Sequence, residues 1–342
     1  MAWSLIHARV HTLLRKRRLL PKHSRVLIAV SGGQDSLCLA RLLIDLRSQW
    51  EWSLGMMHCD HRWRTDSAEN AAYVVALAHQ WQVPAQVKVA SIPPQSEAAA
   101  RQWRYETLAT VAREQGYTHV VTGHTASDRA ETVLYNLIRG SGMDGMGAIP
   151  WQRPIDGTAP TVMLIRPLLD LRRQDTAQFC QQQNITVWAD SSNQDLRLRR
   201  NRIRQELLPY LRQHFNPQVE QALAHTAEVT IAETTYLEAQ AAHLYQRTIT
   251  QTSSQPEAQN EWLIDCPSLC IEPLALQRRV IRQLLTQALL KAPNFSQIEN
   301  LRQLIDAPNR SQSAPFPGGL IAQVRNPYLW LGHMTTLKKL KP

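Results

Sequence analysis

The sequence has no long uninterrupted apolar segment. None of its 342 residues belongs to a run of about eighteen apolar residues, the length that a membrane-spanning helix requires. Near the start, the basic group Arg15-Lys16-Arg17-Arg18 follows an apolar patch. A secretory signal peptide has the opposite order, with its charge before the apolar stretch. We therefore expect a cytoplasmic protein without membrane contacts.

Cysteines are few and are not paired in sequence. The five cysteines are scattered, and no two have the Cys-x-x-Cys spacing that is typical of iron–sulfur or zinc sites. Neither a disulfide framework nor such a metal site is favoured. Acidic residues are also in the minority, since 38 Lys and Arg against 28 Asp and Glu give a net charge of +10. This excess favours a polyanionic partner without identifying it.

The length and the turn signals predict two domains. A chain of 342 residues exceeds one typical domain. Pro209 and the Asn216-Pro217 turn place the boundary near residue 215, which gives domains 1–215 and 216–342. Beyond the boundary, residues 218–290 have a helical pattern that a polar stretch, 250–260, interrupts, and residues 317–331 look like a hairpin. No internal repeat is present.

The first domain alternates apolar strand patterns with amphipathic helix patterns. This alternation predicts a parallel sheet wrapped by helices, with ligands at the carboxyl ends of the strands. Asp66 and Glu69 form a pair like a capping box. We expect strands at 25–30, 52–58, 85–90, 118–122, 162–165 and 185–188, and helices at 37–46, 66–81, 97–115, 128–138 and 174–183.

The segment Ser31-Gly32-Gly33-Gln34-Asp35-Ser36 joins the first strand to its helix. Backbone N–H groups of a small-residue loop, together with the helix N-terminus, form an anion site. Gly32 and Gly33 allow close backbone approach, and Ser31 and Ser36 offer hydroxyl donors. The Gly-Lys-Ser/Thr ending of a Walker loop is missing. The six residues instead resemble the pyrophosphate loop of ATP pyrophosphatases, which split ATP into AMP and pyrophosphate.

Polar residues follow two other strands at the expected ligand edge. Asp60 and His61 end the second strand, where they either contact the nucleoside or only satisfy a turn. His124 follows the fourth strand and is a candidate donor to a phosphate or to the activated base. Asp128 and Glu131 fall at the start of the next helix, where carboxylates complement the helix dipole. The functional alternative is that Asp128 and Asp35 together hold Mg²⁺ beside the triphosphate.

Two further segments are candidates for substrate contacts. The stretch 140–147 is too rich in glycine for a stable helix, and is either a mobile loop over the substrate or a surface linker. Arg197, Arg200 and Arg204 share one stripe of a predicted helix, opposite an apolar side with Leu196. The stripe is either a solvated charged face or a contact surface for phosphates, which the planar guanidinium suits.

Eight segments between residues 25 and 212 together resemble the tRNA(Ile)-lysidine synthetase family of ATP pyrophosphatases. The last three distinguish this family from other pyrophosphatases. The segments are Ser31 to Ser36, His58-x-Asp60-His61-Arg62, Ala98-Ala99-Ala100-Arg101-x-x-Arg104-Tyr105, Gly123-His124-x-x-x-Asp128-x-x-Glu131-Thr132, Arg139-Gly140-x-Gly142-x-x-Gly145-Met146, Ile165-Arg166-Pro167-Leu168-Leu169, Asp190-Ser191-Ser192-Asn193, and Arg200-Asn201-x-Ile203-Arg204-x-x-Leu207-Leu208-Pro209.

The resemblance implies a Rossmann-like α/β domain of the PP-loop type, followed by a smaller, mainly helical tRNA-binding domain that ends in a β hairpin. It also implies that ATP adenylates C2 of the wobble cytidine in an isoleucine tRNA with a CAU anticodon. Free L-lysine then displaces AMP, through its ε-amine in the family. Mg²⁺ is the implied metal, and a homodimer is left open.

The resemblance also assigns roles to residues. The implied catalytic residues are Asp35, His124 and Asp128, of which Asp35 and Asp128 hold the metal. ATP is assigned to Ser31, Gly32, Gly33, Gln34, Asp35, Ser36, Asp60 and His61, and tRNA to Arg101, Arg104, Arg200 and Arg204.

One position departs from the family pattern, which usually has two adjacent acids after the histidine. Here the first of them is Ser127, which we interpret as the helix N-cap, so that Asp128 serves the metal alone. Three rival functions remain in view: a tRNA thiolase, a synthetase of the amidotransferase type, and a non-catalytic RNA-binding protein. Cluster-dependent thiolases need paired cysteines, and the small-molecule synthetases do not need an arginine-rich helix. The intact Asp35, Ser36 and Asp128 argue against a decayed, non-catalytic fold.

Overall fold

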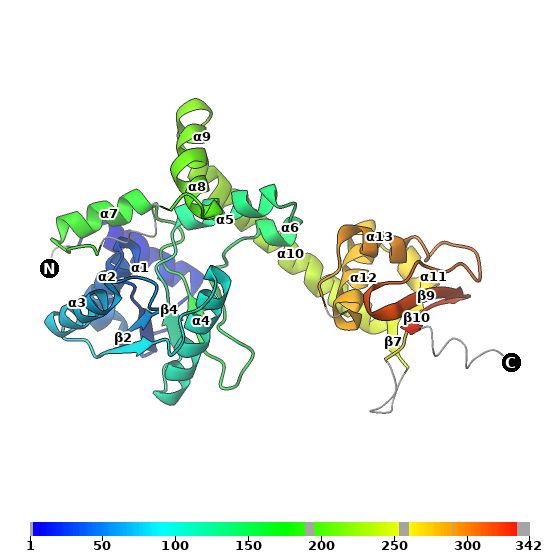
Figure 1. Cartoon of the computed structure of the whole chain (residues 1–342), viewed down its shortest axis with the longest axis horizontal. Helices are drawn as coiled ribbons and strands as arrows, with labels where there is room; N and C mark the ends of the chain where they lie inside the picture. Colours follow the sequence, from blue (N-terminus) through cyan, green and yellow to red (C-terminus); the bar gives the residue numbers. More distant parts are fainter. Residues whose placement is uncertain (1–2, 189–194, 253–259, 290, 334–342) are drawn as a thin grey trace. The chain divides into compact units, whose positions relative to one another are not determined.

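The computed structural model describes residues 3–188, 195–252, 260–289 and 291–333 (Figure 1). The predicted motif at 190–193 lies outside these residues. The chain forms two compact units, Met1–Ile231 and Ala232–Pro342, whereas the sequence suggested a boundary near residue 215. Within the described residues, no helix combines the length and the apolar character that crossing a bilayer requires.

The first unit is built on the predicted parallel sheet. Its six strands have the order β3-β2-β1-β4-β6-β5, and only β5 pairs antiparallel with its neighbour. The predicted strands 25–30 to 162–165 are confirmed, while β5 was not predicted and residues 185–188 form no strand. The strands are β1 Arg25–Ala29, β2 Ser53–Asp60, β3 Ala85–Val89, β4 His119–Val121, β5 Gln152–Pro154 and β6 Met163–Ile165.

Helices cover both faces of this sheet (Figure 1). On β1, Val26 and Ile28 pack into one apolar cluster and Leu27 packs into another, because alternate side chains of a strand face opposite ways. The first cluster takes in the helices α1 Leu5–Arg17, α2 Gln34–Trp50, α3 Ser67–Gln80 and α7 Arg173–Gln182, and the second takes in α4 Glu97–Glu114.

The strand order defines where a ligand would bind. The strand β1 lies between β2 and β4, so the chain leaves β1 toward one side of the sheet and later returns to its other side. In open α/β sheets the ligand crevice lies at such a switch point, beyond the carboxyl ends of the strands. The loop 31–36 follows β1, and the segment from Gly123 follows β4 into α5 Ala126–Ile138. The two motif segments are therefore neighbours at this edge.

Local details correct three sequence-based expectations. Asp66 is the N-cap of α3 but makes no capping hydrogen bond; its carboxylate instead accepts from Arg64 and from Trp188 Nε1. The glycine-rich stretch 140–147 contains a short helix, α6 Met143–Met146. The predicted arginine helix begins only at Arg199, as α8 Arg199–Arg202, and continues as a π-helix over Ile203–Leu207. The helix α9 Leu208–His214 follows.

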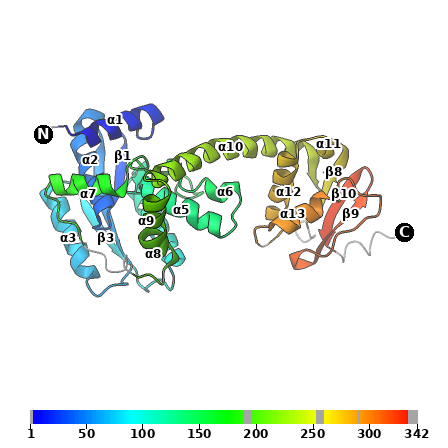
Figure 2. The same cartoon turned by 90° about the horizontal axis from the view of Figure 1, so that it is seen from above.

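The second unit is a small α/β unit (Figure 2). Its antiparallel sheet has the order β7-β8-β10-β9, in which β9 and β10 form the predicted hairpin. The strands β7 and β8 were not predicted. The helix α10 Val219–Thr248 leads into this unit, which contains β7 Ile249–Gln251, β8 Trp262–Asp265, α11 Cys266–Cys270, α12 Leu274–Ala288, α13 Phe295–Arg302, a 3₁₀ turn at Pro317–Gly319, β9 Leu320–Arg325 and β10 Tyr328–His333. The core of the unit lies between α12, α13 and this sheet.

Candidate active site

Hydrogen bonds within the loop 31–36 fix its conformation. Ser36 Oγ donates to the Gly33 carbonyl at 2.9 Å, and the Ser31 N–H donates to Ser36 Oγ at 3.1 Å. Gly32 has a φ of +87°, and a Cβ there would lie 2.2 Å from Asn70 Oδ1, so this position requires glycine. The first N–H groups of α2 have no acceptor within the helix. The loop and the helix start thus present backbone donors for an anion.

Arg173 joins the carboxylates that the sequence singled out. Its Nε donates to Asp35 Oδ2 at 3.1 Å, and its terminal nitrogens donate to Asp128 Oδ1 at 2.7 Å and Glu131 Oε1 at 3.0 Å. The Asp35 carboxylate also accepts from the Thr176 hydroxyl. The carboxylates from α2 and α5 therefore face a single point beside the loop, which a guanidinium from the start of α7 occupies.

The two aspartates of this cluster differ in their electrostatics. Burial raises the pKa of Asp35; Arg173 opposes this shift and the charge of Asp128 adds to it. For Asp128, burial also acts upward, but Arg173, His124 and hydrogen bonds from Thr125 outweigh it and lower the pKa. The N–H and the hydroxyl of Thr125 both donate to Asp128 Oδ2 at 2.8 Å. The site thus keeps Asp128 ionised.

The structure places the helix cap two residues before the position where it was expected. Thr125 is the N-cap of α5 and forms a capping box with Asp128, so the interpretation of Ser127 as the N-cap is wrong. Asp128 lies in the first turn, whereas Glu131 lies beyond it. Ser127 is buried, and its hydroxyl donates to Glu220 in the first turn of α10. The Ser127 side chain therefore does not cap α5 and instead contacts α10.

His124 lies beside the carboxylates as a neutral imidazole. Burial lowers its pKa to about 3; Asp128 opposes the shift, and Arg166, Arg101 and Arg104 add to it. Its Nδ1 lies 2.9 Å from Thr122 Oγ1. Near neutral pH this ring therefore carries no charge, and it has a nitrogen left to donate one hydrogen bond or to accept one.

Asp60 and His61 occupy the end of β2, as expected. Asp60 is buried and accepts from the Arg62 N–H at 2.7 Å, which satisfies the turn. His61 lies with its ring 4.9 Å from Trp103 and 5.7 Å from Trp63, and burial lowers its pKa to about 4. Its buried Nδ1 has no hydrogen-bond partner among the described residues. His61 therefore has a free polar atom within an aromatic setting.

Arginines gather around Tyr105 on α4. The guanidinium carbons of Arg101, Arg104 and Arg153 lie 5.1, 5.6 and 5.3 Å from the centre of the Tyr105 ring. Arg166 is 1% exposed, and it too acts on the pKa of Tyr105. In the part of the chain that the structure describes, none of these four arginines forms an ion pair with a carboxylate. Such uncompensated positive charge favours an anionic ligand.

The three arginines of the predicted stripe do not share one environment. Arg197 precedes α8, is 91% exposed and pairs with Asp195. Arg200 lies 3.5 Å from Glu97 and near Arg101. Arg204 donates to both oxygens of Glu131, at 2.7 and 2.9 Å. Leu196, expected on the apolar side, is 43% exposed. The expectation of a regular stripe is wrong, because Arg197 and Leu196 precede the helix and a π-helical turn begins at Ile203.

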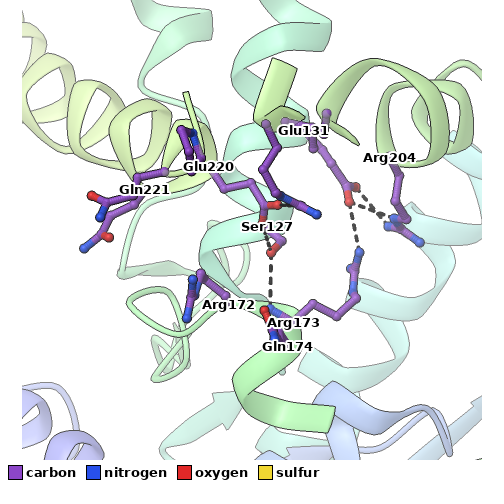
Figure 3. Close-up of a pocket in the computed structure, with 12 residues that line it drawn as sticks. Ser127, Glu131, Arg172, Arg173, Gln174, Arg204, Glu220 and Gln221 are labelled. Carbon is purple, nitrogen blue, oxygen red and sulfur yellow. Dashed lines mark hydrogen bonds and ion pairs between the residues drawn. The ribbon is translucent and has the colours of Figure 1, made fainter. Parts of the chain in front are cut away.

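A cavity of about 380 Å³ adjoins the carboxylate cluster (Figure 3). Ser127, Glu131, Arg173, Arg204 and Glu220 are among the residues that line it. Four residues of this region were not selected as site residues from the sequence, namely Arg153, Arg166, Arg173 and Glu220. The position of Arg173 shortly after the family segment Ile165 to Leu169 was one indication of its role. Its ion pairs with Asp35 and Asp128 are long-range, and no local sequence pattern predicts them.

A parallel sheet with a glycine–serine anion loop after its first strand, and with acids facing that loop, defines a PP-loop ATP-utilising protein. Residues 4–211 match the family model described as the PP-loop domain, and residues 265–328 match the TilS substrate binding domain. The U34-tRNA thiolase NcsA from Methanococcus maripaludis has a similar fold, with a TM-score of 0.54 and 16% identity over 65% of this chain and 77% of that one.

Whole-length relatives narrow the class to one family. The chain is 50% identical to the tRNA(Ile)-lysidine synthase of Nostoc sp., over 97% of this chain and 98% of the relative. It is 48% identical to the enzyme of that name from Synechocystis sp., over 96% and 98%. The chain belongs to the tRNA(Ile)-lysidine synthase family. It is thus an ATP-dependent tRNA-modifying enzyme. The membership excludes the three alternatives, a tRNA thiolase, a synthetase of the amidotransferase type and a non-catalytic RNA-binding protein.

Proposed function

We propose that this protein converts the wobble cytidine of an isoleucine tRNA with a CAU anticodon to lysidine. The C2 carbonyl oxygen of the cytidine attacks the α-phosphorus of ATP, and the bond to the bridging oxygen breaks to release pyrophosphate. The ε-amine of free L-lysine then attacks C2, the C2–O bond breaks, and AMP leaves with that oxygen. The convergence of Asp35 and Asp128 beside the loop 31–36 is the observation that carries this proposal.

The loop and the start of α2 bind the phosphates in this reaction. The loop backbone is fixed before ATP arrives, because hydrogen bonds join Ser31, Gly33 and Ser36. Fixed donors aimed at developing charge are an effective way to lower a reaction barrier. The Gln34 amide instead donates to the Arg173 carbonyl at 2.8 Å and so ties α2 to α7. We assign Gln34 to holding the loop, and Asp60 and His61 to the nucleoside side of ATP.

The donors present fit Mg²⁺ held jointly by protein and phosphate. Mg²⁺ commonly takes one or two carboxylates and completes its shell with water and substrate phosphates. Asp35 and Asp128 are such carboxylates, and both already pair with one cationic group, the Arg173 guanidinium, beside which the metal would bind. Among the described residues no group of three or more His, Cys, Asp or Glu forms a complete protein cage. Bound there, Mg²⁺ would neutralise charge on the departing pyrophosphate.

The arginines provide the surface for tRNA. Arg101, Arg104 and Arg200 lie close together, and the described residues offer Arg101 and Arg104 no carboxylate partner. A base that reacts at C2 must leave its stack, and guanidinium groups suit both its phosphates and its planar face. We assign these three residues, together with Arg204, to the anticodon loop. Neutral His124 is near enough to Asp128, Arg101 and Arg104 for their charges to act on its pKa, and we assign to it a hydrogen bond to a phosphate or to the activated base.

Incubation with labelled lysine, ATP and tRNA transcripts tests the reaction. We expect label in the isoleucine tRNA with the CAU anticodon, and none in the methionine tRNA that shares this anticodon. Omitting ATP should abolish labelling, because the C2 oxygen is then a poor leaving group. Label in both tRNAs, or in neither, would contradict the proposal.

A further inference from the structure

A buried hydrogen bond links two residues that the reaction as described does not use. Ser127 and Glu220 are 4% and 9% exposed, and the Ser127 hydroxyl donates to Glu220 Oε2. Glu220 also pairs with Arg212. A buried carboxylate is costly unless it is paired and hydrogen-bonded. The contact joins α5 to the first turn of α10, within the first unit, and both residues line the cavity of Figure 3.

The same hydroxyl reaches the start of α7. The Arg173 N–H donates to Ser127 Oγ at 3.2 Å. Arg173 is the first residue of α7, so its N–H has no acceptor within the helix. An ionised carboxylate only accepts and an amide N–H only donates. The Ser127 hydroxyl must therefore give its proton to Glu220 and turn a lone pair toward Arg173. Glu220 thus fixes the orientation of the group that holds the Arg173 backbone.

The position of the Arg173 backbone determines where its side chain lies in the carboxylate cluster. Through that side chain, Arg173 contacts Asp35, Asp128 and Glu131 at 3.1, 2.7 and 3.0 Å. Its backbone carbonyl accepts from Gln34 at 2.8 Å, so α2 and α7 are joined at the same residue. A small displacement of the first turn of α7 would consequently move the guanidinium away from three carboxylates at once.

We propose that Ser127 and Glu220 are positioning residues, which act through the Arg173 backbone to hold its guanidinium between Asp35 and Asp128. The inference rests on the proposed function, because it assumes that these two carboxylates take part in adenylation. It also gives the serine at position 127 a defined task. The hydroxyl connects a carboxylate from α10 to the site.

Kinetics of pyrophosphate release from ATP and tRNA test this role. We expect Ser127→Ala to lower kcat about tenfold or more, because a misplacement of about 1 Å near a reacting group has effects of this size or larger. The KM for ATP should change much less than kcat, since the substitution removes no group of the loop 31–36. Glu220→Ala should have a similar effect. The double variant should be no worse than either single one, as for residues of one network. Ser127→Thr retains the hydroxyl and should restore most of kcat.

Two matched controls remove similar groups elsewhere. Thr226→Ala removes a hydroxyl on α10 that donates only to the Ala222 carbonyl, and Glu206→Gln neutralises an exposed carboxylate paired with Arg202. Both should retain wild-type kcat. Thermal unfolding and ATP binding establish that each variant is folded.

The outcomes separate the two proposals. A folded Ser127→Ala variant with wild-type kcat would mean that the bond only packs α10 against α5, and would overturn the inference. Parallel losses of kcat and ATP affinity would also overturn it, because Ser127 would then act on ATP binding. A wild-type protein that releases no pyrophosphate would overturn the proposed function and, with it, the inference.

Discussion

The arginines at the candidate active site fall into two groups: some form ion pairs with buried carboxylates, and others do not. Arg173 and Arg204 are engaged by Glu131 and its neighbouring acids. Arg101 and Arg104 have no carboxylate among the described residues, and Arg200 has a partner at 3.5 Å that is 58% exposed. An exposed ion pair contributes little stability. Arg200 is therefore available for a ligand at low cost, whereas Arg204 is part of the carboxylate cluster.

The substitutions Arg200→Ala and Arg204→Ala should consequently differ. Arg200→Ala should weaken tRNA binding and lower the salt slope of that binding by about one unit, as for one phosphate contact, with unchanged ATP affinity. Arg204→Ala should also slow pyrophosphate release, because it removes a partner of Glu131, which is 3% exposed. Filter binding over a salt series and a pyrophosphate assay measure the two effects. Arg197→Ala, at a 91% exposed position, is the control. Identical profiles for the two variants would refute this division.

Asp35 should be indispensable for turnover but not for folding. Asp35→Asn keeps the shape of the side chain and removes the charge that we assign to Mg²⁺. We expect pyrophosphate release to fall by at least about 100-fold, a loss typical of removing one electrostatic group from a reaction centre. Because burial already raises the pKa of this carboxyl, its neutralisation should leave thermal stability near the wild-type value. Turnover close to wild type at ordinary Mg²⁺ concentrations would contradict the assignment.

At the scale of elements, the site depends on how closely the segment after β4 approaches α2. A Cβ on Gly123 would lie 2.7 Å from the backbone carbonyl carbon and oxygen of Asp35 and 2.9 Å from the Ser36 nitrogen. These backbone atoms belong to the first turn of α2, next to the anion loop. Only a glycine lets the two segments come together without displacing that turn.

Gly123→Ala should therefore damage ATP binding. Overpacking of this kind costs about 1–3 kcal/mol, and here the strain falls on the turn that presents the N–H donors. We expect ATP affinity to fall about tenfold, measured by calorimetry. Gly157→Ala is the control, since a Cβ there would have no neighbour within 4 Å. Equal affinity in both variants would show that α2 accommodates the methyl group without moving its first turn.

The elements also show how far local sequence pattern determines this structure. The strands and helices of the sheet were predictable because each has a clear period of apolar residues and a turn at its ends. The three-residue strand β5 is too short to show an alternation of apolar and polar residues. The strands β7 and β8 lie at the two ends of a polar stretch, so their apolar residues did not form a recognisable strand pattern. The π-helical turn at 203–207 could not be predicted either, because the apolar periodicity of the sequence does not distinguish it from an α-helix. At the site, Asp35 and Asp128 follow from motifs, but Arg173 depends on contacts across more than a hundred residues.

At the scale of the whole molecule, the start of α10 belongs with the first unit. Glu228 on α10 accepts from Arg129 at 2.9 Å, from Arg17 at 2.7 Å and from Trp151 Nε1 at 2.6 Å. Arg129 is only 2% exposed. A cut near residue 215, at the turn that the sequence suggested, would leave this buried guanidinium without its carboxylate. A cut after Ile231 would keep both Glu220 and Glu228.

Truncation at these two points should give different proteins. Residues 1–231 should fold and bind ATP like the full chain, but bind tRNA more weakly, because residues 265–328 match a substrate binding domain. Residues 1–215 should unfold at a lower temperature. The loss of the Arg129–Glu228 pair would cost about 2–3 kcal/mol, somewhat less than a fully buried pair, since Glu228 is 34% exposed. Calorimetry and tRNA binding measure these effects.

Undiminished tRNA affinity in the 1–231 protein would exclude the second unit as an RNA-binding element. Equal thermal stability of the two truncated proteins would instead place the structural boundary at residue 215.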